Sequence, residues 1–487
     1  MQKLPRELFS AQQARAIDYT AQQQMPVTGL QLMTAAAEAG FAVLQKYYPA
    51  ARSLLVVCGA GNNAGDGYLV AKLALQAGYQ VQLVAVGAVD KLKGDAAAAY
   101  QAFVAVGGEV LHDFAAVATV DLVVDALLGT GLARFVTGHF AAAIHYMNDL
   151  TAPVLAIDIP SGLNADTGDI MGCAVHADIS ITFIVLKQGM FTGLAADYCG
   201  RVLFADLQVP AAVIASESYR ASLLKAQALG KRTACAHKGH FGHVLLLGGD
   251  YGYAGALLLA AEAALNSGAG LVSVATRQEH ARQVHLACPE LMGHTLDNIS
   301  DIKPLLAKIT VLVLGPGLGQ TAWAQTIWSA LITDARPKVM DADALNLLAN
   351  APCYADNWIL TPHPGEAARL LRCTTADILR DRFGAVRAIQ QQYGGVCLLK
   401  GAGTLITAGE HVYVNTTGNP GMATGGMGDV LAGMIGALLA QKYSLLEAAK
   451  IGVYLHGLAA DKAAEQAGER GLRASEVVQF LRTVVND

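Results

Sequence analysis

A glycine-rich segment near the C-terminus has the composition of a phosphate-binding site with an adjacent general base. Residues 419–433 read NPGMATGGMGDVLAG, a glycine-rich turn that runs directly into an apolar helix. The backbone N–H groups of Gly426, Met427 and Gly428, with the helix N-terminus, would form an anion hole. The carboxylate of Asp429 would then accept a proton from a substrate hydroxyl. Alternatively, Asp429 would only complement the helix dipole, a contribution of about 0.3–1 kcal/mol; the density of glycines favours the anion hole.

Four other motifs of the C-terminal half each follow a short apolar run that predicts a buried strand. They are GPGLG at 315–319, DADALN at 341–346, TPHPGE at 361–366 and KGAGT at 400–404. The last motif would lie along the phosphate or ribose of a nucleotide. A lone histidine such as His363 is often only a turn residue, but its position after a buried strand favours contact with a ligand. Asp341 and Asp343 would equally well cap the following helix.

The segment CGAGNNAGDG, residues 58–67, links a predicted strand to a predicted helix in the N-terminal half. Its Gly59, Gly61 and Ala64 satisfy the G-x-G-x-x-[GA] pattern of dinucleotide-binding loops, which is a weak signal alone. An ordinary dinucleotide site also needs an acidic residue at the end of the next strand, whereas the first acidic residue here is Asp90. The polar loop therefore favours neither ordinary NAD binding nor a purely structural turn.

Polar side chains also follow two later strands of the N-terminal half. Asp125 and Asp158 each close an apolar run, and Ser161 comes shortly after the second. Because ligands of open α/β sheets bind beyond the carboxyl ends of strands, we expect these side chains and Asn63 to meet in one cleft. Each aspartate alone could instead cap a helix or turn, but the set of three strand ends favours a site.

The order of apolar runs, glycine-rich loops and helical stretches predicts an α/β protein whose parallel sheets are covered on both faces. In the N-terminal half we predict strands at 54–58, 80–86, 122–125, 154–157 and 179–183, and helices at 67–77 and 94–106. In the C-terminal half we predict strands at 243–247, 271–275, 311–314, 339–341, 358–361 and 396–400, a hairpin at 404–414, and helices at 429–441 and 445–467. The segment up to residue 238 lacks a strand-like run, which predicts a boundary near 215–228 between domains at 1–219 and 228–487.

The composition excludes several classes of protein. Hydrophobic residues make up 53% and charged residues 15% of the 487 residues, so the chain is not disordered. With a formal net charge of −5, the chain lacks the excess of basic residues that is typical of a general nucleic-acid binder. The apolar runs are too short for a transmembrane helix, and the N-terminus lacks the apolar core of a signal peptide. Eight dispersed cysteines are typical of reduced thiols in a cytoplasmic protein.

Together, the motifs at 58–67, 125–131 and 156–164 resemble the NAD(P)H-hydrate epimerase domain, the YjeF N-terminal type, over about residues 10–215. That family interconverts the R and S epimers of NAD(P)H hydrate, a damaged cofactor with water added at C6 of the nicotinamide ring. The resemblance implies a Rossmann-like three-layer α/β/α domain with Asp158 as the acid/base residue. It implies a K⁺ site, for which oxygen donors suit a hard cation, made by Asn63, Asp125 and Ser161. It also implies that the substrate is held by Asp158 and by Asn62, Asn63, Ala64, Gly65, Asp66, Gly129, Thr130, Gly131, Leu132, Ala133, Arg134 and Phe135. Family members usually have glycine where this chain has Ala64.

With GGDYGYAG at 248–255, the motifs of the C-terminal half resemble the ADP/ATP-dependent NAD(P)H-hydrate dehydratases, the YjeF C-terminal type, over about residues 228–487. The resemblance implies a ribokinase-like α/β fold in which Asp429 deprotonates the C6 hydroxyl for attack on the terminal phosphate of a Mg²⁺-bound nucleotide. It implies contacts of the hydrate with Ala254, Gly319, His363 and Asp429, and of the nucleotide with Lys400, Gly401, Ala402, Gly403, Thr404 and Gly428. Family members usually have Thr or Ser where this chain has Met427, so the anion hole would rely on backbone amides.

The combined resemblance predicts a bifunctional cytoplasmic enzyme. It would epimerise NADHX and NADPHX, the hydrates of NADH and NADPH, and dehydrate the S epimer. The sequence does not decide between ADP and ATP as the phosphoryl donor, but the resemblance to bacterial bifunctional forms favours ADP. We also expect a homo-oligomer that binds neither nucleic acid nor membrane. The main alternative is a kinase for a small molecule such as a vitamin alcohol, with an accessory N-terminal domain. A second alternative is an N-terminal scaffold like that of RNA-decapping proteins; the intact Asn63, Asp125 and Asp158 and the acidic net charge argue against it.

Overall fold

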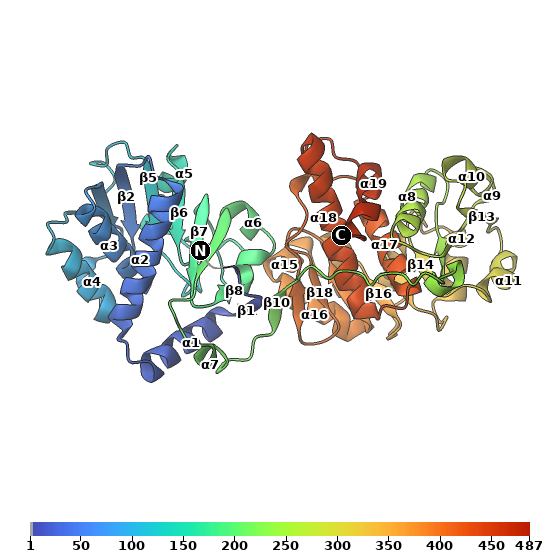
Figure 1. Ribbon diagram of the computed structural model, residues 1–487, viewed down its shortest axis with the longest axis horizontal. Coiled ribbons are helices and arrows are strands. Elements are labelled where there is room, and N and C mark those ends of the chain that lie inside the picture. The colour runs from blue at the N-terminus through green and yellow to red at the C-terminus, as the bar shows by residue number, and fades with distance from the viewer. Residues whose placement is uncertain (1–2) are drawn as a thin grey trace. The chain divides into compact units, whose positions relative to one another are not determined.

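The computed structural model describes residues 3–487. Contacts within the chain divide it into two compact units, Met1–Ser222 and Leu223–Asp487 (Figure 1). The division falls inside the segment 215–228, where the sequence predicts a boundary. Both units are α/β structures built on parallel strands, as the sequence predicts.

The first unit is built on a parallel sheet of seven strands among the described residues. In spatial order these are β4 (Val110–Leu111), β3 (Gln80–Ala85), β2 (Ser53–Cys58), β5 (Leu122–Ala126), β6 (Val154–Ile157), β7 (Ile179–Phe183) and β9 (Arg201–Ala205). The chain runs from β2 outward to β3 and β4, and then returns to β5 on the other side of β2. Such a reversal of direction is the point at which open α/β sheets bind ligands.

Helices cover both faces of this sheet. They are α1 (Ala11–Gln24), α2 (Gly29–Tyr47), α3 (Asn62–Gln76), α4 (Gly94–Val104), α5 (Gly138–Asp149), α6 (Ala195–Tyr198) and α7 (Ala211–Ile214). Alternate residues of β2 point to opposite faces of the sheet. On one face, Leu54 and Val56 belong to the core that α1 to α4 cover. Leu55 and Val57 join a second core beneath α5. The three-layer arrangement expected for this half is confirmed.

A small ribbon of strands joins the two ends of the first unit's sequence. Strand β1 (Glu7–Phe9) pairs parallel with β8 (Leu186–Lys187), and antiparallel with residues Ala221 and Ser222 of β10 (Ala221–Leu223). The prediction that this last segment contains no strand is wrong. The strand is three residues long, and its hydrogen-bond partner lies at the opposite end of the sequence, so no local pattern identifies it.

The second unit contains nine strands in one sheet among the described residues. In spatial order they are β13 (Met292–Thr295), β12 (Leu271–Thr276), β11 (His243–Leu247), β14 (Val311–Leu314), β15 (Lys338–Met340), β16 (Trp358–Leu360), β17 (Val396–Leu399), β18 (Leu405–Thr407) and β19 (Val412–Val414). Strands β13 to β17 are parallel, whereas β17, β18 and β19 pair antiparallel. The predicted hairpin at 404–414 is therefore confirmed.

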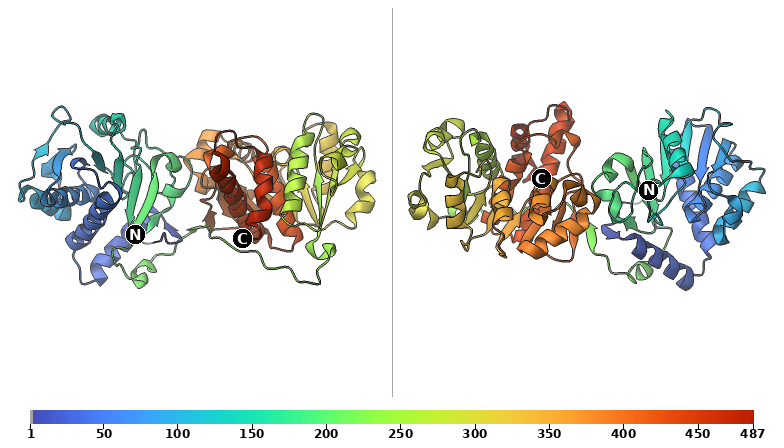
Figure 2. Two further views of the ribbon diagram at one scale, coloured as in Figure 1. Left: turned by 45° about the horizontal axis from the view of Figure 1, so that its top comes forward. Right: turned by 180° about the vertical axis from the view of Figure 1, so that it is seen from behind.

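Helices pack against the sheet of the second unit, and those nearest the C-terminus are drawn in red in Figure 2. The helices are α8 (Ala254–Asn266), α9 (Gln278–Ala281), α10 (Val284–Ala287), α11 (Lys303–Leu306), α12 (Ala322–Leu331), α13 (Asp343–Asn350), α14 (Pro364–Leu371), α15 (Thr375–Arg380), α16 (Arg382–Tyr393), α17 (Met427–Ala440), α18 (Leu445–Ala467) and α19 (Ala474–Val484). Helix α17 is buried along most of its length and packs against α8, α18 and β14. Its first turn is therefore held firmly at the carboxyl edge of the sheet.

Most predicted strands agree with the structure within one or two residues, but helix α3 begins at Asn62 rather than at residue 67. The sequence analysis took the intervening glycines as loop residues. In the structure they allow close packing, because a Cβ at Gly65 would lie 2.5 Å from Sδ of Met33. A Cβ at Gly67 would lie 2.5 Å from the Cβ of Ala126. The short strands β4, β9 and β13 were also not predicted.

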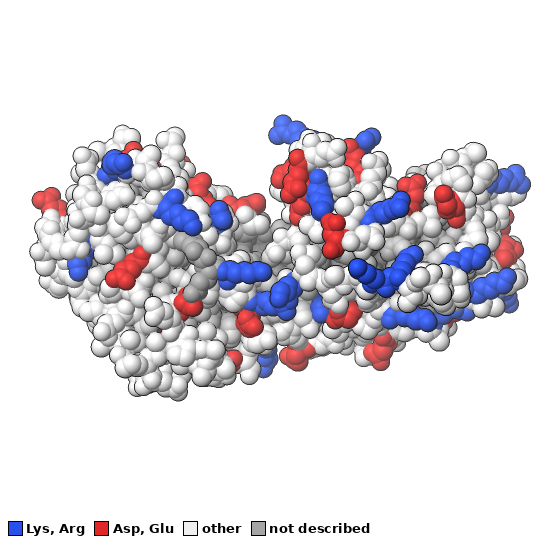
Figure 3. Space-filling model, viewed as in Figure 1, with Lys and Arg blue, Asp and Glu red and all other residues white. Residues whose placement is uncertain are grey.

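Charged side chains are sparse on the molecular surface. On the face shown in Figure 3, Lys and Arg are interspersed with Asp and Glu, with wide uncharged areas between them. Within residues 3–487, no single helix has both the length and the apolar composition needed to cross a membrane; the bent pair α1 and α2 passes only when the two are counted together.

The contact between α17 and α8 gives a first testable prediction. A methyl group at Gly433 would lie 1.9 Å from the carbonyl oxygen of Ala260 in α8, so the helices must move apart to admit it. We expect Gly433→Ala to destabilise the second unit by about 1–3 kcal/mol, the usual cost of overpacking. Gly255→Ala in α8 is the control, because a methyl group there meets no atom within 4 Å. Equal thermal stability of the two variants would contradict the packing described.

Candidate active sites

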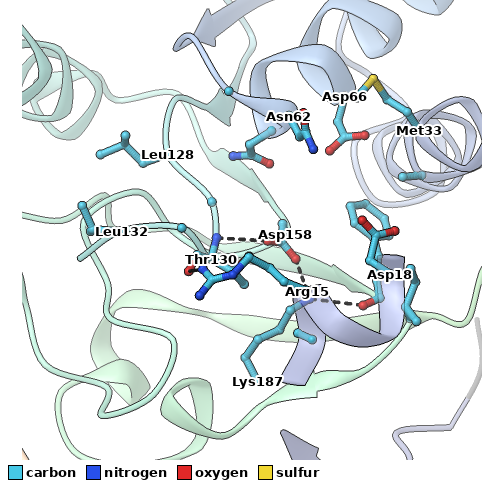
Figure 4. A pocket seen from close by; sticks show the side chains of 18 of the residues that line it. Arg15, Asp18, Met33, Asn62, Asp66, Leu128, Thr130, Leu132, Asp158 and Lys187 are labelled. Carbon is cyan, nitrogen blue, oxygen red and sulfur yellow. Dashed lines mark hydrogen bonds and ion pairs between the residues drawn. The ribbon is translucent and has the colours of Figure 1, made fainter. Parts of the chain in front are cut away.

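A cavity of about 540 Å³ lies in the first unit, next to the reversal point between β2 and β5 (Figure 4). It is lined by α1, α2, the start of α3, the loops after β5 and β6, and Lys187. The predicted substrate-binding residues that line it are Asn62, Asn63, Asp66, Gly129, Thr130, Gly131, Leu132, Ala133, Arg134 and Asp158. The remaining three do not line it. Ala64 and Gly65 are buried in α3, whereas Phe135 is 65% exposed.

The N-terminus of α3 opens toward this cavity. Its N-cap residue is Gly61, and no side chain accepts a hydrogen bond from the first turn. The N–H groups of the first turn are therefore available to an anionic group of a ligand. Gly59 is needed just before this point, because a Cβ there would lie 2.1 Å from the carbonyl oxygen of Leu127.

Asp158 is held in the cavity by an unusual backbone and by a buried lysine. Its φ of 69° lies in the left-handed region, which is costly for a residue with a side chain. Its Oδ1 accepts a hydrogen bond of 2.5 Å from Nζ of Lys187, and its Oδ2 accepts one of 3.3 Å from the N–H of Thr130. Lys187 also donates to Oγ1 of Thr182 and to the carbonyl oxygen of Phe183, so its ammonium group is fully paired.

Lys187 and two residues of α1, Arg15 and Asp18, line the same cavity but were not predicted from the sequence. For Lys187 a signal existed, since it is a lone charge directly after the apolar run 183–186. Its side chain is only 4% exposed, which a lysine tolerates only when it is paired. No comparable signal marks Arg15 or Asp18, because both lie on a largely polar helix.

Two further carboxyl groups lie near Asp158. Burial raises the pKa of Asp66 well above its usual range, and the charges of Asp158 and Asp18 raise it further, while Lys187 opposes them. Burial also raises the pKa of Asp18, against a hydrogen bond from Gln22. The cavity therefore places several carboxyl groups around a single ammonium group.

The structure brings together two of the three residues that the resemblance assigns to K⁺. Asp125 is buried and accepts hydrogen bonds from Oγ of Ser161 at 2.6 Å and from its N–H at 2.8 Å. Burial raises the pKa of Asp125 to about 6, although both hydrogen bonds oppose the shift. Asn63 is buried too, and neither atom of its side-chain amide has a hydrogen-bond partner. An unpaired buried amide oxygen is free to bind a hard cation.

In the second unit, α17 begins at Met427 and places Asp429 in its first turn, as predicted. The N-cap residue Gly426 has a φ of 91° and provides no side-chain cap, so the first N–H groups are free. A Cβ at Gly428 would lie 3.1 Å from Nζ of Lys400 and 3.4 Å from Oδ2 of Asp341. The helix N-terminus and these two charged groups therefore adjoin one another.

Lys400 is the centre of a polar cluster at the carboxyl ends of β15, β16 and β17. Its Nζ lies 2.7 Å from Oδ1 of Asp341 and 3.9 Å from Oε2 of Glu366. The same Oδ1 of Asp341 accepts a hydrogen bond of 2.7 Å from Oγ1 of Thr361. Burial disfavours the charge of Lys400, but Asp341 and Glu366 outweigh it and raise the pKa of the lysine.

The surroundings of Asp429 favour its neutral form. Burial raises its pKa to about 7, with a further contribution from Asp341 and an opposing one from Lys400. Burial likewise raises the pKa of Glu366 to about 7, although Lys400 opposes this shift. A carboxyl group with a pKa near neutrality exchanges protons readily at physiological pH, which is what a general base requires.

The alternative role of Asp341 and Asp343 as helix caps is wrong. The N-cap of α13 is Ala342, and it receives no side-chain hydrogen bond. Asp341 pairs with Lys400, and Oδ2 of Asp343 accepts a hydrogen bond from the N–H of Gly319 at 2.8 Å. Asp343 thus fixes the GPGLG loop. A Cβ at Gly317 in that loop would lie 2.6 Å from the carbonyl oxygen of Tyr253, so the loop adjoins the start of α8 at Ala254.

His363 has a structural role in α14. Its Nδ1 accepts hydrogen bonds from the N–H groups of Gly365 and Glu366, and Glu366 in turn accepts one from the N–H of His363. The imidazole is half exposed, and burial lowers its pKa. Its contact with a ligand stays a prediction.

The KGAGT segment forms a loop directly after β17. The buried side chain of Arg382 fixes the start of this loop, because it donates hydrogen bonds to the carbonyl oxygens of Leu399 and Lys400. The loop consists of Lys400, Gly401, Ala402, Gly403 and Thr404, and Oγ1 of Thr404 donates to the carbonyl oxygen of Gly401. Arg382 was not identified from the sequence, because a charge in a helix normally indicates an exposed position.

Sequence models of two protein families match this chain. The model described as YjeF-related protein N-terminus matches residues 29–189. The model described as NAD(P)H-hydrate dehydratase matches residues 244–482. Each match lies within one of the two units.

Named proteins are similar to the chain over nearly its whole length. A bifunctional NAD(P)H-hydrate repair enzyme from Coxiella burnetii (strain RSA 493 / Nine Mile phase I) is 44% identical, over 98% of this chain and 99% of its own. The protein of that name from Escherichia coli (strain K12) is 43% identical, over 99% of this chain and 95% of its own. An ADP/ATP-dependent NAD(P)H-hydrate dehydratase from Bacillus subtilis, co-crystallized with ATP/Mg²⁺, is 30% identical over 53% of this chain and 93% of its own, with a TM-score of 0.48. Since the first two relatives are matched across both units, the chain belongs to the family of bifunctional NAD(P)H-hydrate repair enzymes.

Proposed function

We propose that this chain repairs both epimers of hydrated NADH and NADPH. The first unit interconverts the R and S hydrates, and the second dehydrates the S hydrate while ADP is converted to AMP and phosphate. The observation that carries the proposal is the cluster at the start of α17. There a carboxyl group with a pKa of about 7, Asp429, adjoins the ammonium group of Lys400 and an uncapped helix N-terminus.

The dehydration needs phosphorylation, because hydroxide is a poor leaving group. The oxygen of the C6 hydroxyl attacks the terminal phosphate of the nucleotide, while Asp429 accepts the proton of that hydroxyl. The N–H groups of Gly426 to Gly428 and the ammonium group of Lys400 stabilise the charge of the phosphoryl group in transfer. Mg²⁺ accompanies the nucleotide and neutralises part of its phosphate charge. Phosphate then leaves C6 together with a proton from C5, which restores the dihydropyridine ring.

The epimerisation depends on Asp158 as the acid/base residue, with Lys187 as its positioning partner. The residues proposed to hold K⁺ are Asn63, Asp125 and Ser161, and the unpaired amide of Asn63 supports this assignment. A bound K⁺ would supply a fixed positive charge near Asn63, which lines the cavity. The preference for ADP, the cytoplasmic location and the homo-oligomeric state stay predictions.

The direct test is recovery of NADH from a mixed sample of R and S hydrate. With Mg²⁺ and ADP, we expect recovery of the near-ultraviolet absorbance of NADH to reach completion faster than spontaneous epimerisation allows. Parallel reactions with ATP and without nucleotide are the controls and decide which nucleotide is the phosphoryl donor. Recovery of NADH from the S hydrate alone would contradict the epimerase assignment. A stable phosphorylated product in place of NADH would favour a small-molecule kinase.

The role of Asp429 predicts a large loss of activity on removal of its carboxyl group. Asp429→Asn should lower the rate of S-hydrate dehydration by about 10²–10⁴-fold, the usual contribution of a general base. The matched control is Glu447→Gln, which removes a carboxylate from the first turn of α18, where it pairs with Lys450. Full turnover by Asp429→Asn would show that the base is another group.

The shifted pKa of Asp429 also predicts the pH dependence of dehydration. A base acts only when ionised, so the rate should fall about tenfold per pH unit below a pH of about 7. Above that pH the carboxylate is ionised and the rate should level off. Single-turnover dehydration of S hydrate, measured between about pH 5.5 and about pH 9, checks this profile. A constant rate down to about pH 5.5 would contradict a buried base at this position.

The proposed K⁺ site predicts a cation-specific effect on stability. A ligand that binds only the folded state raises the unfolding temperature with its concentration. We expect KCl to raise the unfolding temperature of the first unit more than NaCl does, and Asn63→Ala to abolish the difference. Asn62→Ala, in the same helical turn but exposed, is the control. An identical response to the two salts in the unaltered chain would contradict the site.

A further inference from the structure

Two carboxyl groups enter the cavity of the first unit from opposite sides. In Figure 4, Asp66 extends into it from α3, while Asp158 faces it from the loop after β6, beside Lys187. We infer that Asp66 is a second catalytic acid–base residue of the epimerase, which exchanges a proton with the ring nitrogen while Asp158 exchanges one with the C6 hydroxyl. This inference rests on the proposed epimerase function.

The carboxyl group of Asp66 is free to meet a substrate. It is the fifth residue of α3, beyond the first turn, so it does not serve as a cap. Among the described residues, none forms a hydrogen bond or ion pair with it. The helix beneath it is rigid, because the glycines on either side in sequence pack closely. A Cβ at Gly65 would lie within 3.1 Å of the backbone of α4, at Ala96.

The surroundings of the two carboxyl groups differ. Asp158 has an ammonium group at 2.5 Å and an N–H donor from Thr130. Asp66 has neither, and burial together with the charges of Asp158 and Asp18 raises its pKa well above the usual range. Two carboxyl groups in one site with such different surroundings are typical of a pair that divides the acid and base roles.

Other charged groups also face the cavity. These are Arg15 and Asp18 from α1, Asp95 from α4, Arg134 from the loop after β5, and Lys187. Of these groups, Asp18 raises the pKa of Asp66, whereas Lys187 lowers it. Since Nζ of Lys187 is already bound to three oxygen atoms, Asp66 is left without a cationic partner.

The chemistry of the hydrate requires two such groups. C6 carries both the hydroxyl group and the ring nitrogen N1. Asp158 accepts the hydroxyl proton, the O–H electron pair forms a C=O bond, and the C6–N1 pair passes to N1. Asp66 donates its proton to N1, which completes ring opening. Rotation about the C5–C6 bond presents the other face of the aldehyde, and the reverse transfers close the ring with C6 inverted. Every proton returns to its donor, so no co-reactant is needed.

The test compares three variants with the unaltered chain, with R hydrate as substrate and the rate of spontaneous epimerisation subtracted. We expect Asp66→Asn to lower the epimerase kcat by about 10²–10⁴-fold with little change in KM, because an amide cannot deliver the proton. Asp66→Glu should retain measurable activity. The control Asp149→Asn removes an exposed carboxyl group at the end of α5, outside the cavity, and should behave like the unaltered chain. A rise in KM alone, or an unchanged kcat, would overturn the inference.

Failure of this inference is distinguishable from failure of the proposed function. If the unaltered chain does not epimerise R hydrate, the epimerase itself is wrong. Dehydration of pure S hydrate by the second unit should be unchanged in every variant. If Asp66→Asn lowers the unfolding temperature of the first unit, the pH profile of Asp66→Glu decides. If the alkaline limb of this profile is displaced from that of the unaltered chain, the result supports a proton donor at position 66. If the limb is not displaced, the inference is wrong.

Discussion

A buried ion pair between lysine and aspartate organises the chemistry of each unit. In the first unit Lys187 binds Asp158, and in the second Lys400 binds Asp341, at 2.5 Å and 2.7 Å. Leaving one partner of a buried pair without the other costs about 3–5 kcal/mol, so neither side chain can easily move away. Both aspartates follow parallel strands at the carboxyl edge of a sheet, where loops from several strands meet. This arrangement lets distant parts of the sequence form one compact site.

Site residues at the ends of strands or in glycine-rich turns could be predicted from the sequence. Residues that reach a site only through tertiary contacts were not predicted. Asp125, Asp158 and Asp429 were found because strand ends and glycine-rich turns have local patterns. Lys187 was missed because its partners come from tertiary contacts, although its place after an apolar run was a usable signal. The left-handed backbone of Asp158 and the early start of α3 also depend on packing rather than on local preference. The edge strand β10 depends on a partner at the far end of its unit's sequence.

Two departures from the family pattern have simple structural explanations. Ala64 lies inside a regular turn of α3 and is fully buried, so its methyl group adds apolar contact without strain on the backbone. Met427 is 6% exposed and packs into the core at the start of α17. It offers no hydroxyl group to a phosphate, so in the proposed anion site the N–H groups of the turn and Lys400 would supply the positive field. The proposed site would then depend on backbone geometry more than on side-chain identity.

In the proposed repair, two carboxylates in separate units perform consecutive steps on one substrate. The most direct measurement is NADH recovery from mixed R and S hydrate by Asp158→Asn, by Asp429→Asn and by an equal mixture of the two. We expect that recovery by Asp158→Asn stops at the S share, that Asp429→Asn recovers almost nothing, and that the mixture reaches completion. Rapid conversion of R hydrate by Asp158→Asn alone, or a mixture no better than its parts, would contradict the proposed repair.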